Sequence, residues 1–547
     1  MARLEVVEQS NLSDILSHNL PLEPSEVVSL QRRIAQLEGE LHHHRAAVST
    51  ARLLSLETLG HIFAFVFTDR GLNAKERETL LNLGLVSKHW RHATLYNHHL
   101  WGRINLEAAH LNPAAYDKII AWLKRSGDTP RTIEFLEDPY ASEEFPDWPP
   151  DRECTGSELC LWRNPIVIRL LAEGPSLDRV ALGAVSVGCL FHLMGSLKSW
   201  KKNAPHSQMP WNSLKTLALP FRQCRWVYTT EDGTAKSVFH DLPDTIQYLQ
   251  LWLPAEEFAF QHDNAIPLLD MPQAFLKNLV SFEIQINWES SDLLAALASC
   301  SNLETLVVDL AISRFDVDED EGNTQGPVFQ QLADTGICLP KLRRLQLREQ
   351  AVALELLRYL VTPVLEDLDI GYSKHKMPPQ LHHQGLLDSP FAETVLPFIK
   401  ERSGCQSTLR SLRILNRKIP SEELVSVLIE LPSITHLTLD QVTIDHDSLW
   451  ESLREHAQAA KESKLAVPLR HLAVLNLLGL KRLPFFFNRI FEFLIEVRGR
   501  KGCQLVISLP NGGISRAVKQ YERYKAPDSE FEEKFKVALS ILPAAEE

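Results

Sequence analysis

Histidine, cysteine and acidic clusters are the features of this sequence that could do metal chemistry. Three consecutive histidines stand at 42–44 in a helical stretch, where successive side chains point in different directions and cannot share one ion. The eight cysteines are scattered, with no pair at the C-x-x-C spacing of a zinc or redox site. The acidic run at 316–321 resembles a calcium loop, but Glu321 and Pro327 stand where an EF-hand requires Gly and Glu. We therefore expect no metal, and a solvated loop at 316–321.

Motifs for phosphate binding and hydrolysis are missing from the sequence as well. It contains no G-x-x-x-x-G-K-[ST] or G-x-G-x-x-G loop, no H-E-x-x-H and no G-x-S-x-G. The net charge of −13 argues against a nucleic-acid partner, since gripping phosphates requires an excess of Lys and Arg. Four further histidines are expected on the surface rather than as ligands: His89, His92, His98 and His99. We predict that the chain is not an enzyme and carries no cofactor.

The N-terminus, the apolar runs and the cysteines indicate in which compartment the protein acts. The N-terminus has acidic residues at once and no apolar stretch of the kind found in secretory signals. The longest apolar runs reach about half of the ~20 residues that a membrane helix requires. Scattered cysteines in a chain of 547 residues are typical of reduced thiols. We expect a cytoplasmic and/or nuclear protein with no membrane partner.

Residues 24–50 carry a heptad pattern that predicts a helix, after a flexible N-terminus at 1–23. Val27, Ile34 and Leu41 occupy a positions and Leu30 and Leu37 occupy d positions, followed by Val48 and the polar His44. Two interpretations remain open. We prefer a single helix that packs back on its own domain. The alternative is a coiled-coil seam that forms a weak homodimer.

Residues 51–107 predict a bundle of three short helices. Leu59, Ile62, Phe63 and Val66 are expected on one face of the first helix. A second helix is expected over 80–90 and a third near 95–101. Such a unit has more apolar surface than about 50 residues can bury, so it should require a partner.

This segment resembles the F-box of the expanded protein families of mushroom-forming (basidiomycete) fungi, which follow a heptad helix in the same way. The matching residues are Arg52, Leu54, Glu57, Leu59, Ile62, Phe63, Leu83, Val86, Ser87, Trp90, Arg91, Leu100, Trp101 and Ile104. Ser55 and Leu56 replace the prolines usual at the start of the first helix, and Ser is a competent N-cap. The resemblance implies binding to the adaptor subunit and cullin of an SCF complex. The adaptor-binding residues would be Leu54, Leu59, Ile62, Phe63, Leu83, Val86, Trp90, Leu100 and Trp101.

The remainder, 108–510, repeats a phrase close to Leu-x-x-Leu-x-Leu. Ten copies begin at Leu177, Leu214, Ile246, Leu279, Leu303, Leu342, Leu365, Leu409, Ile434 and Leu469, at intervals of 23 to 44 residues. The fold class is therefore α/β, a small all-α F-box bundle followed by an irregular leucine-rich-repeat-like solenoid. Parallel strands would line one side and helices the other. Leu505–Leu509 reads as the last strand, and 511–547 as a C-terminal tail with an amphipathic helix near 530–542.

The residues between the leucines of each phrase should alternate outward onto one sheet face. That face would present Tyr248, Gln250, Trp252, Asp309, Arg344, Arg348, Asp367, Asp369, Arg413 and His436. Aromatic and Arg side chains are typical interface anchors, so Tyr248, Trp252, Arg344, Arg348 and Arg413 are candidate target-binding residues. Pairing of these arginines with Asp367 and Asp369 is the structural alternative. The predicted function is the substrate-recognition subunit of an SCF-type cullin-RING ubiquitin ligase; the alternative is a non-degradative F-box scaffold.

Overall fold

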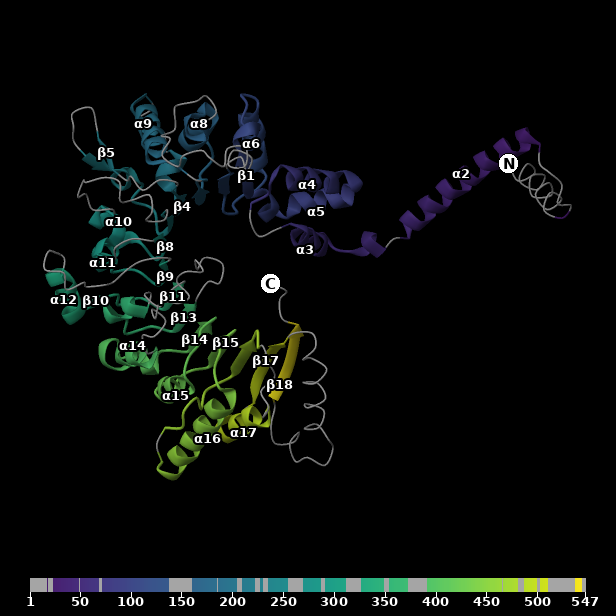
Figure 1. Ribbon diagram of the computed structural model, residues 1–547. Coiled ribbons are helices and arrows are strands. Elements are labelled where there is room, and N and C mark those ends of the chain that lie inside the picture. The colour runs from purple at the N-terminus through teal and green to yellow at the C-terminus, as the bar shows by residue number, and fades with distance from the viewer. Residues whose placement is uncertain are drawn as a thin grey trace. The chain divides into compact units, whose positions relative to one another are not determined.

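The computed structural model divides the chain into two compact units, Met1–Trp101 (unit 1) and Gly102–Glu547 (unit 2) (Figure 1). It describes residue 17 and residues 23–48, 50–67, 71–136, 160–183, 185–203, 209–221, 227–229, 235–253, 269–286, 291–310, 326–348, 354–371, 391–464, 466–480, 487–498, 502–509 and 537–543. The acidic run at 316–321 lies outside these residues. In the described part of the chain, no helix is long and apolar enough to cross a bilayer.

Unit 1 is helical throughout its described elements. These are α2 (Pro24–Ala47), η1 (Thr50–Leu53), α3 (Leu56–Val66), α4 (Ala74–Val86), α5 (Lys88–Tyr96) and η2 (His98–Trp101). Side-chain caps explain why α3 to α5 begin where they do. Ser55 accepts from the Thr58 amide as predicted for an N-cap, and Asn73 forms a reciprocal capping box with Glu76.

Ser87 corrects one prediction about these helices. A single helix was expected over 80–90, but Ser87 is extended (φ −160°, ψ 166°), so α4 ends at Val86. The Ser87 hydroxyl accepts from the Trp90 amide and starts α5. A Ser hydroxyl that accepts from a free backbone amide can start a new helix, and this contact competes with continuation of the preceding helix. The apolar pattern alone does not reveal such a cap.

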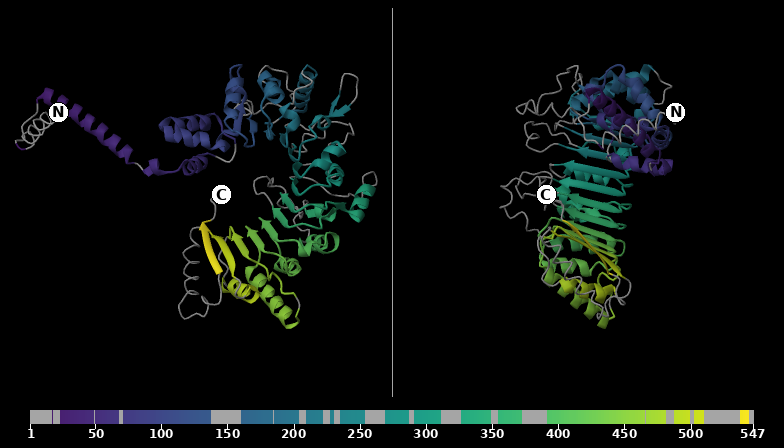
Figure 2. Two further views of the ribbon diagram at one scale, coloured as in Figure 1. Left: turned by 180° about the vertical axis from the view of Figure 1, so that it is seen from behind. Right: turned by 90° about the vertical axis from the view of Figure 1, so that its right-hand side faces the viewer.

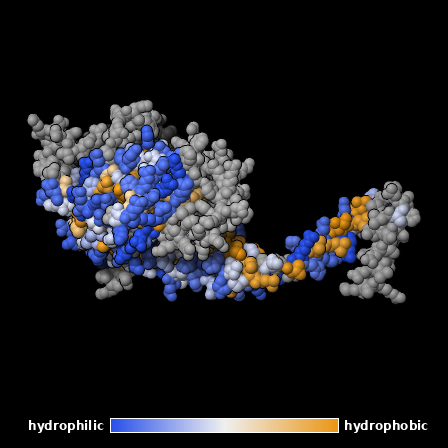
Figure 3. Space-filling model, turned by 90° about the horizontal axis from the view of Figure 1, so that it is seen from below, coloured by the Kyte–Doolittle hydropathy of each residue, from blue (hydrophilic) through white to orange (hydrophobic). Residues whose placement is uncertain are grey.

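Helix α2 confirms the predicted helix but not the preferred interpretation of its seam. Ile34, Leu37 and Leu41 are 54%, 47% and 49% exposed, so these a and d side chains are not buried by packing back on the domain. Figure 3 shows apolar patches that alternate with hydrophilic ones along this helix. The seam therefore lacks a partner within the described part of this chain.

Unit 2 is built on one parallel sheet whose 14 strands follow chain order, as the stacked arrows of Figure 2 show. The strands are β1 (Arg103–Glu107), β2 (Thr132–Leu136), β3 (Arg179–Ala181), β4 (Thr216–Pro220), β7 (Tyr248–Trp252), β8 (Ser281–Ile286), β9 (Thr305–Leu310), β11 (Arg344–Arg348), β13 (Asp367–Gly371), β14 (Ser411–Leu415), β15 (His436–Asp440), β16 (Val474–Leu478), β17 (Cys503–Leu509) and β18 (Val537–Pro543). Nine of the ten repeat phrases overlap one strand each, from β3 to β15. The tenth phrase, which begins at Leu469, was placed three residues early, because the leucines in register with the neighbouring strand are Leu475 and Leu477 of β16. The prediction of adjacent parallel strands is confirmed.

Helices connect successive strands and lie along one face of this sheet, on the outer side of its curve (Figure 1). They are α6 (Ala115–Lys124), α8 (Pro165–Glu173), α9 (Val187–Asn203), α10 (Gln273–Asn278), α11 (Ser291–Ala298), α12 (Gly326–Thr335), α14 (Phe391–Pro397), α15 (Ser421–Ile429), α16 (His446–Glu462) and α17 (Phe487–Arg498). The short helices are η3 (Ala108–His110), η4 (Leu161–Arg163), η5 (Pro210–Ser213), η6 (Val238–Asp241), η8 (Leu356–Arg358), η11 (Phe398–Arg402) and η12 (Cys405–Ser407). Two small sheets pair β5 (Val227–Thr229) with β6 (Ala235–Ser237), and β10 (Ile337–Cys338) with β12 (Leu360–Val361). The opposite face of the large sheet is concave and free of described helices.

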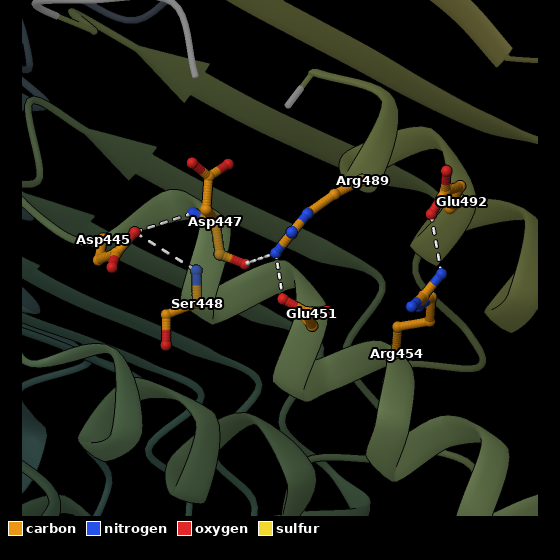
Figure 4. A network of polar contacts seen from close by, with 7 residues as sticks. All are labelled: Asp445, Asp447, Ser448, Glu451, Arg454, Arg489 and Glu492. Carbon is orange, nitrogen blue, oxygen red and sulfur yellow. Dashed lines mark hydrogen bonds and ion pairs between the residues drawn. The ribbon is translucent and has the colours of Figure 1, made fainter. Parts of the chain in front are cut away.

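The core lies between the sheet and its helices. Along β8, for example, Phe282, Ile284 and Ile286 are fully buried while the intervening residues are half-exposed. Stacked neighbours share this apolar layer, which no single repeat could bury alone. Charged pairs tie the helices together at the surface. Arg489 of α17 pairs with Glu451 of α16, and Arg454 of α16 pairs with Glu492 of α17 at 2.8 Å (Figure 4).

Two predicted boundaries were wrong at the ends of the sheet. The segment 103–107 was assigned to the helical bundle, but it forms β1, whose Ile104 and Leu106 are buried. At the other end, Val537–Pro543 is a strand rather than part of a helix, and it pairs in parallel with β17. Without this strand, the edge of β17 would carry unpaired backbone groups, and the alternating sequence Val-Ala-Leu-Ser-Ile pairs with them as a strand.

Candidate protein-binding surfaces

The helices α3 to α5 form a packed unit around aromatic side chains. The rings of Phe63 and Trp90 lie 5.1 Å apart, and the Trp101 indole donates to the Thr94 carbonyl at 2.8 Å. The side-chain amide of Asn97 donates to the carbonyl of Gly60 at 2.8 Å. A Cβ at Gly60 would lie 3.3 Å from the Asn97 side chain, so only a small residue fits easily there. These contacts fix α3 against α5, and they leave other apolar side chains of the unit uncovered.

The nine predicted adaptor-binding residues fall into three groups by burial. Leu59, Phe63, Leu100 and Trp101 are buried, Leu54, Leu83 and Trp90 are half-buried, and Ile62 and Val86 are exposed. The four buried residues hold the fold and are not available for direct contact. The prediction that they bind a partner is corrected to a structural role. Of the nine predicted adaptor-binding residues, only Ile62 and Val86 have exposed side chains.

Several exposed apolar residues of unit 1 were missed by the sequence reasoning. Phe65 is 90% exposed, Leu53 85% and Leu85 70%, and Val66, Leu81, Leu95 and Tyr96 are exposed as well. On the same helix α3, Leu59 and Phe63 are buried, whereas Ile62 and Val66 are exposed. All four residues fall within one apolar face of the helix, so the spacing alone gave no signal that separates core from surface.

The concave face of unit 2 presents the outward residues of the strands in continuous rows. The register aligns Tyr248 with Ser281, Thr305, Arg344, Asp367, Ser411 and His436 across successive strands. A parallel row runs through Trp252, Gln285, Asp309 and Arg348. Rows of this kind follow from strand register alone, so the outward direction predicted for these residues is confirmed.

The structure places the five candidate target-binding residues in two groups. Tyr248 is 42% exposed and Trp252 is half-buried, both on β7. The arginines lie on β11 and β14, three or more strands away. Because neighbouring strands are about 4.8 Å apart, the aromatic group and the first arginines are separated by roughly 14 Å.

The three arginines carry acidic partners on neighbouring strands. Arg348 donates two hydrogen bonds to Asp369 at 2.7 and 2.6 Å, and the Nε of Arg344 lies 3.5 Å from Asp367. Arg413 donates to Asp440 at 2.8 Å. The pairing proposed as the structural alternative is thus present for Arg344 and Arg348. Their strengths differ, because the Arg348 side chain is 20% exposed and that of Arg344 60%.

A polar chain continues the same face toward the first strands of unit 2. Arg179 donates to the Gln250 side chain at 2.7 Å, and Gln250 in turn donates to Glu283 at 2.7 Å. Further along, Asn476 donates to the Thr438 hydroxyl at 3.0 Å. These cross-strand contacts hold the outward side chains in fixed positions, which favours recognition of a shaped surface over flexible capture.

Small-molecule and metal sites find little support in the described residues. A hollow of about 390 Å³ at the N-terminal ends of β7, β8, β9 and β11 is lined by Asp244, Thr245, Gln247, Asn278, Val280, Asn302, Glu304 and Lys341. The amides of Asn278 and Asn302 are committed there to backbone carbonyls of the preceding repeat. Within the described ranges, no three His, Cys, Asp or Glu side chains are grouped to hold a metal ion.

Comparisons with known proteins add little. No protein-family model matches the sequence, and no curated protein matches it. One similar solved structure is the crystal structure of a TLR13–ssRNA13 complex, at 14% sequence identity and a TM-score of 0.24. The match covers 62% of this chain and 37% of that chain, so this chain spans well under half of that protein's length. A likeness this distant carries no argument about what this chain binds.

Proposed function

We propose that this chain is the substrate-recognition subunit of an SCF-type cullin-RING ubiquitin ligase. Unit 1 would bind the adaptor subunit, which carries the cullin, and unit 2 would hold a target protein. The observation that carries the proposal is the apolar surface left open on α3 to α5. A lone Phe or Leu at a surface is ordinary, whereas Ile62, Phe65, Leu85 and Val86 together in so small a unit favour a protein partner. The resemblance to the F-box names the partner's class.

The proposed mechanism is proximity rather than chemistry by this chain. The adaptor and cullin would hold a conjugating enzyme near the target, and the chain itself would contribute no catalytic group and no cofactor. Positioning two reactants can lower a barrier by up to ~7–11 kcal/mol. Rigid cross-strand contacts in unit 2 suit this role, since a target must be held in a defined orientation. In this proposal the protein acts in the cytoplasm and/or nucleus.

The exposed residues define a sharper test than the buried ones. Alanine at Leu59 or Trp101 would open a cavity in unit 1 and abolish binding by unfolding, which proves nothing about contact. Aspartate at Ile62 and Val86 instead changes open surface. Fully burying one aliphatic side chain is worth about 1.5–3 kcal/mol, so the double variant should weaken adaptor binding at least roughly tenfold.

The measurement is co-purification of the adaptor and cullin with the full chain, followed by titration with purified adaptor. Circular dichroism should show unchanged helix content in Ile62→Asp/Val86→Asp. The matched control is Tyr248→Asp, which also places a charge at an exposed apolar site but lies in unit 2; it should bind adaptor normally. Wild-type affinity in the folded double variant would overturn the proposal.

The alternative function is a non-degradative scaffold. It would bind the adaptor in the same way, but the target that it holds would not be ubiquitinated. A target that is captured by unit 2 and ubiquitinated only when the adaptor site is intact supports the ligase. A target that is captured but never modified, in the presence of cullin and conjugating enzyme, supports the scaffold.

A further inference from the structure

Helix α2 carries an apolar seam, interrupted by the polar His44, that has no partner among the described residues. Ile34, Leu37 and Leu41 are about half exposed, and Val48 is 80% exposed, so the apolar side chains of the seam lie open. Apolar patches are visible along the helix in Figure 3. From these observations we infer that α2 pairs with α2 of a second copy of this chain, as a parallel, in-register, two-stranded coiled coil. The inference does not rest on the proposed ligase function.

The residue types at the seam favour two parallel strands. Val27, Ile34 and Val48 place β-branched side chains at a positions, with Leu41 the exception, and Leu30 and Leu37 occupy d. β-branched residues at a with Leu at d pack best in parallel dimers and worse in trimers or tetramers. The seam is short and includes the polar His44 at d, so association should be concentration-dependent rather than permanent.

The charges beside the seam are complementary for the parallel arrangement. Arg33 and Glu40 occupy g positions, and Glu38 and Arg45 occupy the e positions that a parallel partner brings next to them. The dimer thus gains Arg33–Glu38′ and Glu40–Arg45′ pairs, each formed twice by symmetry. An in-register antiparallel dimer would align Arg33 with Glu40′ and leave Glu38 and Arg45 without complementary partners at the seam.

Contacts within the single helix leave these charges available. Histidines aside, none of the four has an oppositely charged residue three or four positions away on its own helix. Arg33 donates to the neutral Gln36 at 3.0 Å, and Gln36 donates to Glu40 at 2.9 Å. The two g-position side chains therefore extend along one flank of the seam without forming an ion pair there.

A dimer of this kind would join two copies of each binding surface. Two linked copies bind a target with two sites far more tightly than one copy, provided that the linkers let both engage. The residues of the seam are distinct from those of the surfaces of α3 to α5 and of the concave sheet.

The test uses the full chain and analytical ultracentrifugation over a range of concentrations. Wild-type protein should show a monomer–dimer equilibrium, and Arg33→Glu should raise the dissociation constant roughly tenfold, since two attractive pairs become repulsive. The matched control is Arg32→Glu, the same change at the outward f position next door, which should leave the equilibrium unchanged.

Two double variants fix the orientation. Arg33→Glu/Glu38→Arg restores the parallel pairs with reversed polarity and should recover wild-type dimerisation. Arg33→Glu/Glu40→Arg would restore only the antiparallel pairs, so recovery in that variant would overturn the inference. A wild-type chain that stays monomeric at every accessible concentration would overturn it as well.

Discussion

Gly371 lies beside the Arg348–Asp369 ion pair on the concave face, and replacing it with alanine should destabilise unit 2. A Cβ at this position would stand 2.8 Å from the Nη1 of Arg348 and 3.1 Å from the Cβ of Leu415. The tip of an arginine normally moves aside easily. Here it cannot do so without loss, because both terminal nitrogens of Arg348 donate to Asp369.

The size of the effect follows from the strength of that pair. Hydrogen bonds to charged groups contribute about 1.5–3 kcal/mol, whereas exposed ion pairs contribute about 0–1 kcal/mol. Both side chains of the Arg348–Asp369 pair are 20% exposed, so the pair lies between these limits. We expect Gly371→Ala to lower the free energy of unfolding by about 1–2 kcal/mol, most of it through the displaced guanidinium.

Urea unfolding of wild-type, single and double variants measures this effect. If the guanidinium carries the effect, Gly371→Ala should cost less than about 0.5 kcal/mol once Arg348 is alanine. A full cost in that background would assign the effect to Leu415 and refute the reasoning. Gly195→Ala is the matched control: its Cβ meets nothing within 4 Å inside α9, so it should stabilise the helix by about 0.5–1 kcal/mol.

Two further predictions follow from buried ionisable groups. Burial raises the pKa of Cys300 to about 12 and that of Cys405 to about 11, so at pH 8 native alkylation followed by mass spectrometry should label the exposed Cys338 first. Equal labelling rates would contradict this. Burial lowers the pKa of His446 to about 4 although Asp445 raises it, so the unfolded chain binds the proton more tightly. Stability should be full above about pH 6.5 and fall toward pH 4 by up to roughly 3 kcal/mol. Urea titrations of His446→Leu should show a flatter dependence on pH, and an unchanged slope would count against the assignment.

The repeat region was predictable because its signal is local and repeated. Each phrase alternates buried leucines with outward residues, so period-two patterning identified the strands β3 to β15 one at a time and missed the register of β16 by three residues. Their parallel order then followed from the need of each repeat to stack on the next. The last strand, Val537–Pro543, was missed because it lacks the leucine phrase and its place depends on the open edge of β17. Such an edge exists only once the sheet has assembled, so the local sequence does not reveal it.

The binding surfaces were only partly predictable, for a similar reason. An apolar pattern says that Leu59, Ile62, Phe63 and Val66 prefer burial, but the supply of neighbouring helices decides which are covered. In unit 1, α5 packs against the side of α3 that carries Leu59 and Phe63, and Ile62 and Val66 remain open. Likewise, outward arginines were predictable from alternation. Their aspartate partners depended on which strands became neighbours.

The pairing of charges on the concave face narrows how a target segment would bind there. Displacing Arg348 from Asp369 costs more than releasing Arg344, whose contact with Asp367 is long and solvent-exposed. Arg344 is therefore the arginine that an acidic group could engage most easily. Tyr248 lies in the same row, separated from Arg344 by Ser281 and Thr305, whose side chains are small. At about 3.3 Å per residue, an extended segment of roughly four to five residues spans the ~14 Å between them. Under the proposed function, an apolar residue at one end of such a segment would contact Tyr248 and an acidic residue at the other end would pair with Arg344.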